Sequence, residues 1–206
     1  LAGQLRLVGE LLEARPDQRR PLLGARAAIE AAREKLAAAE ASGLLGLEGT
    51  AAAAYFQALA AVLPPSLGFS GRNRRPPRDP VNACLSLGYA LATHEAGRQA
   101  QLVGLDPLLG FLHAPVPGRP ALACDLVEPV RCHVDRLVWR LFAEGRLRAE
   151  HAKSTAEGCL LGKAGREIFY LAFEAELGAL PRLLRQMAAA LARELRARPQ
   201  PEWLSC

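Results

Sequence analysis

Residues 180–197 read LPRLLRQMAAALARELRA, a stretch rich in Leu, Ala, Arg and Glu that contains no β-branched residue. Its apolar side chains recur at helical spacing, and residues of these types favour helices. The same pattern continues through most of the 206 residues, whereas no stretch alternates convincingly as a strand does. The sequence therefore predicts an all-α fold, a single multi-helix domain over residues 1–206.

Proline and glycine mark the ends of the expected helices. Breaks occur at Pro16-Asp17, Pro64-Pro65, Asp79-Pro80 and residues 178–181, and the proline-rich segment 114–120 cannot continue a helix. We expect helices at residues 3–14, 21–42, 47–63, 80–104, 121–145, 163–177 and 180–197.

Residues 71–80 form a predicted exposed loop that combines four arginines with a double proline, which favours an extended backbone. Such a loop can grip a DNA backbone through salt-sensitive phosphate contacts, or it can be a solvated linker. The candidate DNA-binding residues in it are Arg72, Arg74, Arg75 and Arg78.

The chain is basic, with a formal net charge of +5 and a pI near 9.2. This charge would attract a polyanion such as DNA, and arginine, which far outnumbers lysine, suits bidentate phosphate contacts. A genome that prefers arginine codons explains the same composition equally well.

Cysteine content and hydropathy bear on the cellular compartment. Five cysteines without a CxxC pair suit a reducing cytoplasm better than a disulfide framework. The longest uncharged stretch, residues 50–71, is rich in alanine and broken by prolines, so we expect no membrane helix. Because the sequence begins at Leu1 without a leader pattern, we expect a piece of a longer protein.

Candidate chemistry centres on Asp125 and Glu128, which lie three residues apart in the expected helix 121–145. His113 precedes them across the proline-rich segment, and Glu48 opens an earlier helix. Carboxylates with one imidazole and no thiolate suit Mg²⁺ or Mn²⁺ and hence phosphoryl transfer.

Plain structural alternatives exist for each of these residues. Carboxylates at helical spacing are usually a solvated face, and a histidine after apolar residues is often a hydrogen-bonded core residue. A zinc site from His113, Cys124, Cys132 and His133 is also conceivable, but its spacing matches no common zinc module.

Six segments of the chain form an ordered set of motifs: residues 47–56, 71–83, 85–91, 104–113, 118–128 and 165–174. In this order they resemble the C-terminal helical catalytic domain of the CRISPR-associated integrase that works in spacer acquisition. The resemblance covers about residues 40–195, and the motif set is more specific than any of its parts.

The resemblance implies that Glu48, His113 and Glu128 hold Mg²⁺ or Mn²⁺, that Asp125 is an accessory catalytic carboxylate and that Arg131 contacts phosphate. It implies attack of a spacer precursor's 3′-hydroxyl on a repeat phosphodiester, with nuclease activity when water attacks instead.

The resemblance also implies partners: double-stranded DNA, a homodimer, and a small partner protein whose dimer bridges two integrase dimers, all in a prokaryotic cytoplasm. A fused reverse transcriptase is possible, because some members of the family carry one. The family's N-terminal β-rich lobe has no counterpart before residue 40. Two other functions stay open, a catalytically silent DNA-binding scaffold and a helical protein-interaction domain.

Overall fold

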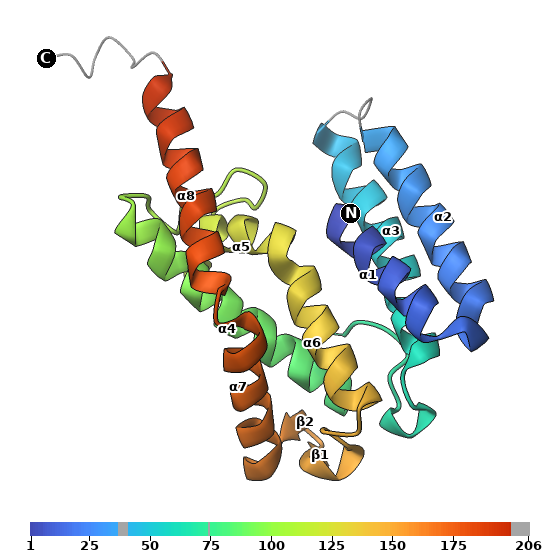
Figure 1. Cartoon of the computed structure of the whole chain (residues 1–206). Helices are drawn as coiled ribbons and strands as arrows, with labels where there is room; N and C mark the ends of the chain where they lie inside the picture. The colour runs from blue at the N-terminus through green and yellow to red at the C-terminus, as the bar shows by residue number, and fades with distance from the viewer. Residues whose placement is uncertain (37–40, 74, 199–206) are drawn as a thin grey trace, which may run out of the picture. The chain divides into compact units, whose positions relative to one another are not determined.

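The structure is a computed structural model that describes residues 1–36, 41–73 and 75–198. Helices make up most of it (Figure 1), so the all-α prediction is confirmed. The α-helices are α1 (Ala2–Ala14), α2 (Arg19–Leu36), α3 (Ala41–Val62), α4 (Pro80–Leu102), α5 (Ala121–Val127), α6 (Arg131–Ala143), α7 (Lys163–Leu177) and α8 (Leu180–Ala197). The strands are β1 (Ala152–Thr155) and β2 (Gly158–Leu161), and short 3₁₀ turns are η1 (Pro16–Gln18), η2 (Pro65–Leu67), η3 (Glu128–Val130) and η4 (Ala149–His151).

The chain folds into two compact units. The first consists of residues 1–86 and 132–173, and the second of residues 87–131 and the described residues from 174 onward. Helices α4 and α7 each run from one unit into the other. The expectation of a single domain stays a prediction.

In the first unit, α1, α2 and α3 pack on one another (Figure 1). Leu7, Ile29 and Leu59 are completely buried in their core. Each such side chain contributes roughly 1.5–3 kcal/mol through the hydrophobic effect. This burial stabilises a helical bundle whose individual helices would be marginal alone.

Polar contacts tie α6 to α1 and α3 inside the first unit. The hydroxyl of Tyr55 on α3 donates a hydrogen bond to Asp135 on α6 across 2.8 Å, in a buried environment. The guanidinium of Arg136 donates through Nε to Glu10 on α1 across 2.6 Å. Buried polar groups need such partners, so these contacts set which face of α6 points inward.

A short antiparallel hairpin, β1–β2, belongs to the first unit and was not predicted from sequence. Its register pairs Lys153 with Leu160. Gly158 opens β2 at φ +128, and a Cβ there would lie 2.7 Å from Pro76 Cβ. Strands of four residues are too short for a clear alternating pattern, and it is packing against the arginine-rich loop that positions this pair.

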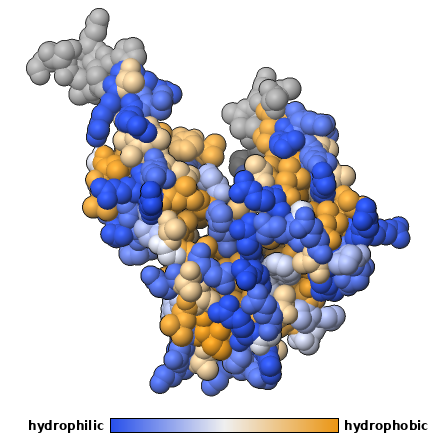
Figure 2. Space-filling model, in the orientation of Figure 1, coloured by the Kyte–Doolittle hydropathy of each residue, from blue (hydrophilic) through white to orange (hydrophobic). Residues whose placement is uncertain are grey.

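In the second unit, α8 packs along an apolar stripe with Leu180, Leu184, Ala188 and Ala192 buried at four-residue spacing. Its exposed surface is largely hydrophilic (Figure 2). Small residues let the helices of this unit approach closely: a Cβ added at Gly97 of α4 would meet Ala123 of α5 at 3.7 Å. Helix α8 therefore forms as the sequence predicts, on residues 180–197.

The helix expected at 47–63 is α3, which begins six residues earlier at Ala41, and the helix expected at 80–104 is α4, which ends at Leu102. Two other expected helices differ more. The helix expected at 121–145 is α5, η3 and α6, because Pro129 has no N–H to donate and tightens the chain into a 3₁₀ turn. Of the helix expected at 21–42, α2 ends at Leu36, residues 37–40 lie outside the described residues, and residues 41–42 already belong to α3.

The described cysteines form no disulfide. Cys84, Cys132 and Cys159 are buried, and burial raises the pKa of each thiol. They act as small apolar residues of the core. Every helix in the described part of the chain is too short or too polar to cross a lipid bilayer.

Candidate active site

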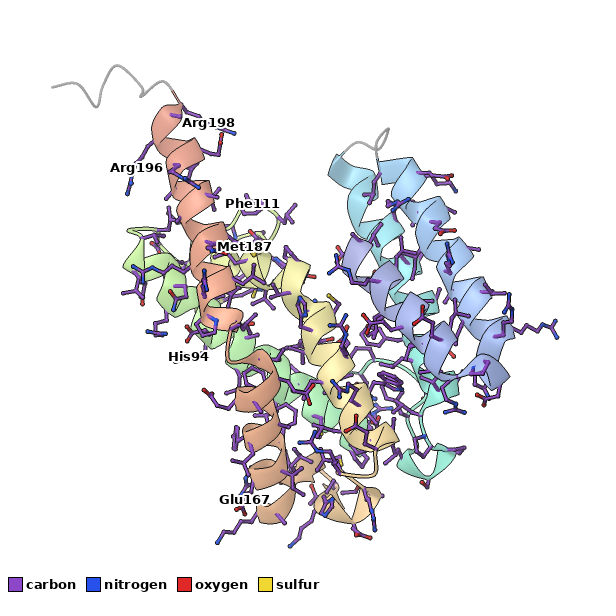
Figure 3. The ribbon with its side chains drawn as sticks, in the orientation of Figure 1. His94, Phe111, Glu167, Met187, Arg196 and Arg198 are labelled. Carbon is purple, nitrogen blue, oxygen red and sulfur yellow. The ribbon has the colours of Figure 1, made fainter. Side chains whose placement is uncertain are left out.

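The turn that carries His113 folds around one carboxylate in the second unit. The backbone N–H groups of Phe111, Leu112 and His113 all donate to Asp125, at 2.6, 3.1 and 3.0 Å. His113 Nδ1 also lies 2.6 Å from Asp125 Oδ1. Phe111 itself is exposed (Figure 3), whereas the Asp125 side chain has no exposed surface. The buried Asp125 carboxylate therefore fixes the backbone of residues 111–113 through these hydrogen bonds.

The ionisation of Asp125 reflects two opposing effects. Burial alone would raise its pKa, but the hydrogen bonds from His113 and from the three backbone N–H groups outweigh burial and lower the pKa. The carboxylate therefore stays charged and accepts a hydrogen bond from the N–H group at His113 Nδ1. Nε2 is then the imidazole nitrogen left to bind a ligand, with the ring orientation held by a carboxylate.

Gly110 permits this arrangement, and sequence reasoning missed it. A Cβ at this position would lie 2.8 Å from Asp125 Oδ2, from Ala121 Cβ and from the carbonyl oxygen of His113. No side chain fits at that distance, so the loop can approach α5 only with glycine. The available signal was the glycine three residues before the histidine.

Glu128 and Arg131 form an ion pair one turn after Asp125. Glu128 begins η3, and its Oε1 accepts a hydrogen bond from Arg131 Nη1 at 2.6 Å. Both side chains are about a quarter exposed. The Arg131 guanidinium also lies over the Tyr89 ring, 4.4 Å from its centroid. The Arg131 guanidinium is therefore fixed by Glu128 and Tyr89 and remains partly exposed.

Asp125 and Glu128 thus have different environments despite their helical spacing. Both oxygens of Asp125 accept hydrogen bonds inside the protein, whereas Glu128 reaches the surface. Asp125 is placed to orient His113, and Glu128 is placed to meet a ligand from solvent.

Glu48 lies on α3 in the first unit and is exposed. Among residues 1–36, 41–73 and 75–198, no group of three or more His, Cys, Asp or Glu side chains has a metal-binding arrangement. The residues considered for a zinc site, among them Cys124 and Cys132, therefore form no such group in the described part of the chain. The raised pKa of Cys132 also disfavours the thiolate that zinc requires.

The arginine-rich loop is braced at its first arginine. Arg72 is half-buried and donates to Asn82 Oδ1 at 2.8 Å and to Ser86 Oγ at 3.0 Å, both on α4. Arg75 and Arg78 are exposed, as expected for residues that contact DNA, and Arg74 lies outside the described residues.

The backbone of this loop is held at two further points. Asp79 caps α4 by accepting from the backbone and side-chain N–H groups of Asn82, at 2.8 and 2.6 Å. The carbonyl of Pro77 accepts a hydrogen bond from the Cys159 N–H of β2 at 2.7 Å. The exposed arginines therefore project from a fixed support.

Comparison with known proteins now identifies the family. The family described as "CRISPR associated protein Cas1" matches this sequence over residues 1–175, most of its length. The chain belongs to the Cas1 family. Relatives of this Cas1-family chain include "CRISPR-associated endonuclease Cas1 1" of Thermus thermophilus, 43% identical over 178 residues that cover 86% of this chain and 55% of the relative.

A protein of the same name from Thermodesulfovibrio yellowstonii is 47% identical over 133 residues, 64% of this chain and 42% of the relative. The chain therefore spans about half the length of these relatives. A chain solved in a "Partial Cas6-RT-Cas1--Cas2 complex" superposes with a TM-score of 0.82 at 26% identity, covering 94% of this chain and 62% of that one. The helical character of the fold agrees with these Cas1 proteins.

Proposed function

We propose that this Cas1-family chain catalyses metal-dependent strand transfer, inserting spacer DNA into a CRISPR array. The observation that carries the proposal is the His113–Asp125 pair at 2.6 Å, with the partly exposed carboxylate of Glu128 three residues after Asp125 in the chain. A carboxylate-oriented imidazole is the arrangement typical of a metal-binding histidine. The names of the relatives, which are endonucleases, agree with this chemistry.

The donor set suits Mg²⁺ or Mn²⁺, because it offers carboxylate oxygens and one imidazole but no thiolate. We assign Glu48, His113 and Glu128 as the ligands on the family resemblance alone, since the described residues contain no ready-made group of three such side chains. When bound, such an ion polarises a scissile phosphate and favours deprotonation of an attacking hydroxyl.

The protein residues then have separate tasks. Asp125 keeps the proton of His113 on Nδ1, so that Nε2 keeps its lone pair. Arg131 is held where it can contact a non-bridging phosphate oxygen and offset the charge that develops during displacement. Arg75 and Arg78 contact the DNA backbone, and we assign Arg72 and Arg74 to the same loop contact.

The reaction conserves phosphodiester bonds. The 3′-hydroxyl of the incoming strand forms a new bond to a repeat phosphorus as the bond to the repeat's own 3′-oxygen breaks, and the hydroxyl proton ends on that oxygen. No nucleotide cofactor is therefore needed, and water in place of the hydroxyl gives endonuclease activity.

The proposed setting is a homodimer that works with a small Cas2-type partner dimer in a prokaryotic cytoplasm. The structural relative was solved in a complex whose description names Cas1, Cas2 and a reverse transcriptase, so a fused reverse transcriptase also belongs to the proposal.

A catalytically silent DNA-binding scaffold is the second candidate. The ion pair between Glu128 and Arg131 favours it, because a carboxylate neutralised by arginine is a weaker metal ligand. This alternative predicts salt-sensitive DNA binding without any metal-dependent product.

The deciding experiment joins a DNA end bearing a 3′-hydroxyl to a plasmid that carries the repeat, in the presence of the small partner protein. Joining is measured in Mg²⁺, in Mn²⁺ and in chelator for the unchanged chain, for His113→Ala and for His94→Ala. His94 is an exposed histidine on α4 in the same unit (Figure 3) and serves as the matched control.

The proposal predicts joining in Mn²⁺, none in chelator, loss in His113→Ala and retention in His94→Ala. DNA binding without joining in either divalent ion, Mg²⁺ or Mn²⁺, would support the silent scaffold instead.

A further inference from the structure

Four arginines of α8 share one exposed face of the helix. At 3.6 residues per turn, Arg182, Arg185, Arg193 and Arg196 fall within an arc of about 80°, and all four are exposed. We call these four residues the α8 arginine stripe. Arg196 lies near the C-terminal end of α8 in Figure 3, and hydrophilic residues cover much of the helix surface in Figure 2.

The stripe carries no compensating negative charge. The one acidic residue of α8, Glu194, lies about 100° or more around the helix from every arginine of the stripe. Among the described residues, the structure pairs none of the four guanidinium groups with a carboxylate. The positive charge along this face is therefore unneutralised and available to a ligand.

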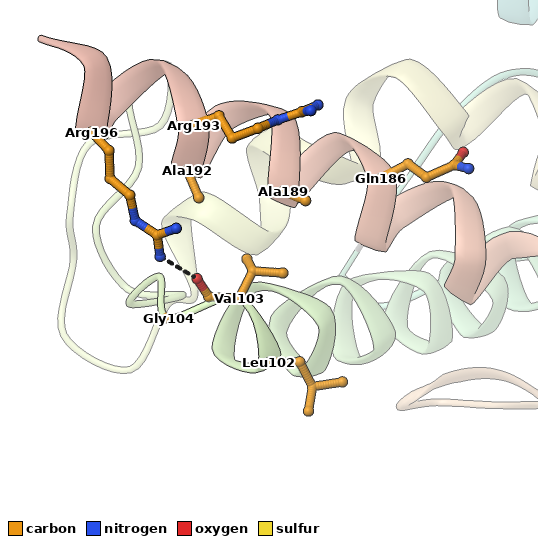
Figure 4. Close-up of a pocket in the computed structure, with 8 residues that line it drawn as sticks. All are labelled: Leu102, Val103, Gly104, Gln186, Ala189, Ala192, Arg193 and Arg196. Atoms are coloured by element: carbon orange, nitrogen blue, oxygen red, sulfur yellow. Dashed lines mark hydrogen bonds between the residues drawn. The ribbon is translucent and has the colours of Figure 1, made fainter.

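A groove borders one end of the stripe within the second unit (Figure 4). It has a volume of about 710 Å³ and is lined by the end of α4 and by α8, where two alanines precede two arginines. Arg196 Nη2 donates to the Val103 carbonyl across 3.4 Å, a long bond that leaves other N–H groups of the guanidinium for a ligand. The groove is lined by Leu102, Val103, Gly104, Gln186, Ala189, Ala192, Arg193 and Arg196.

The residue types of this face favour a nucleic acid over a protein. Between the arginines the same arc presents only Ala189, and Gln186 lies just outside it. Hot spots of protein interfaces combine arginine with Trp and Tyr in well-packed pockets, whereas this arc presents arginine without any aromatic residue. Planar guanidinium groups match phosphates with two parallel hydrogen bonds.

We propose that the α8 arginine stripe is a DNA-binding surface for the phosphate backbone of a duplex, made of residues other than those assigned to the candidate active site and the 71–80 loop. Residues 182 and 196 are about 21 Å apart along the helix axis. That length matches the axial rise of about six base pairs. The stripe holds duplex DNA without reading its sequence, and the inference rests on the proposed function for the kind of ligand.

The test measures duplex binding in chelator, so that it does not depend on catalysis. Fluorescence anisotropy of a labelled duplex of about 30 base pairs, long enough to cover the stripe several times over, gives the affinity of the whole chain over a series of salt concentrations. The variants are Arg193→Gln/Arg196→Gln and Arg182→Gln/Arg185→Gln. The matched control is Arg20→Gln/Arg33→Gln, two exposed arginines of α2 in the first unit.

Each lost phosphate contact reduces the magnitude of the slope of log affinity against log salt by about 0.9. Each stripe variant removes two arginines and should therefore reduce this magnitude by almost 2. The control should keep the slope, and Arg193→Lys/Arg196→Lys should restore most of it because the charge returns. Circular dichroism confirms that each variant is folded; should a glutamine pair unfold the chain, Arg193→Ala/Arg196→Ala takes its place.

An unchanged slope in both stripe variants overturns the proposal, and so does an equal loss in the α2 control, which would indicate bulk charge. A stripe variant that keeps the DNA slope but no longer binds the small partner protein would make the stripe a protein interface. The proposed function fails separately: if joining persists in His113→Ala while the stripe variants lose their slope, the catalytic assignment is wrong and the stripe stands.

Discussion

At the scale of single residues, the candidate site depends on how one buried carboxylate is used. Asp125 accepts hydrogen bonds from three consecutive backbone N–H groups and lies 2.6 Å from the ring nitrogen of its histidine partner. In the proposed site it is a positioning residue, because it would act on a ligand through His113 and its side chain has no exposed surface. Such partners usually matter almost as much as the ligands themselves.

Asp125→Asn should raise the Mn²⁺ concentration needed for half-maximal joining by about 10–100-fold. The amide has one acceptor oxygen, so it can no longer serve both the loop N–H groups and His113 Nδ1. Activity measured across a Mn²⁺ titration checks this, with urea unfolding alongside to report the structural cost.

Asp125→Glu keeps the charge and should recover part of the metal affinity. If Asp125→Asn lost stability while its Mn²⁺ dependence stayed unchanged, the role of Asp125 would be structural alone.

At the scale of elements, the helices are joined by a few polar contacts in otherwise apolar interfaces. The Tyr55 hydroxyl reaches Asp135 across 2.8 Å and links α3, which carries Glu48, to α6. Asp135 is 3% exposed, so water cannot readily replace a lost donor.

Tyr55→Phe should therefore destabilise the protein by about 1–3 kcal/mol, because a buried acceptor loses one hydrogen bond. The free energy of unfolding from urea denaturation measures the effect. Tyr170→Phe on α7 is the matched control, because Tyr170 is 45% exposed and should change stability little. Equal effects of both substitutions would contradict this account of the Tyr55 contact.

At the scale of the whole molecule, His133 couples the stability of the fold to pH. Burial lowers the pKa of His133, and the positive charges of Arg136 and Arg6 lower it further against a smaller opposing effect of Glu10. The unfolded chain therefore binds a proton at His133 more readily than the folded protein does. Stability from this residue is present above the unfolded pKa, about 6.5, and declines as pH falls toward the folded pKa.

Urea unfolding of the unchanged chain should accordingly show a lower free energy at about pH 5.5 than at about pH 7.5, values on either side of the unfolded pKa. His133→Asn should reduce that difference, because the amide does not titrate. His94→Asn, which changes an exposed histidine, should leave it unchanged. A pH difference that persists in full in His133→Asn would assign it to other groups.

Much of the fold was predictable because helix formation depends on local sequence. The helix expected at 163–177 coincides with α7, and Pro80 begins α4 as predicted, since helical periodicity and proline breaks are written in neighbouring residues. The break of the expected helix 121–145 into α5, η3 and α6 also has a local cause, Pro129. It was not predicted, because the apolar residues on both sides of Pro129 continue the helical spacing.

Sequence alone determined the helical class, the family resemblance that the Cas1 match bears out, and the residue types available for chemistry. The tertiary structure decided how those residues differ. It buried Asp125 beneath the His113 turn, paired Glu128 with Arg131, and braced Arg72 while leaving Arg75 exposed. The physical reason is that helix periodicity depends on near neighbours, whereas burial and hydrogen-bond partners are set by segments distant in sequence, here across the close approach that Gly110 permits.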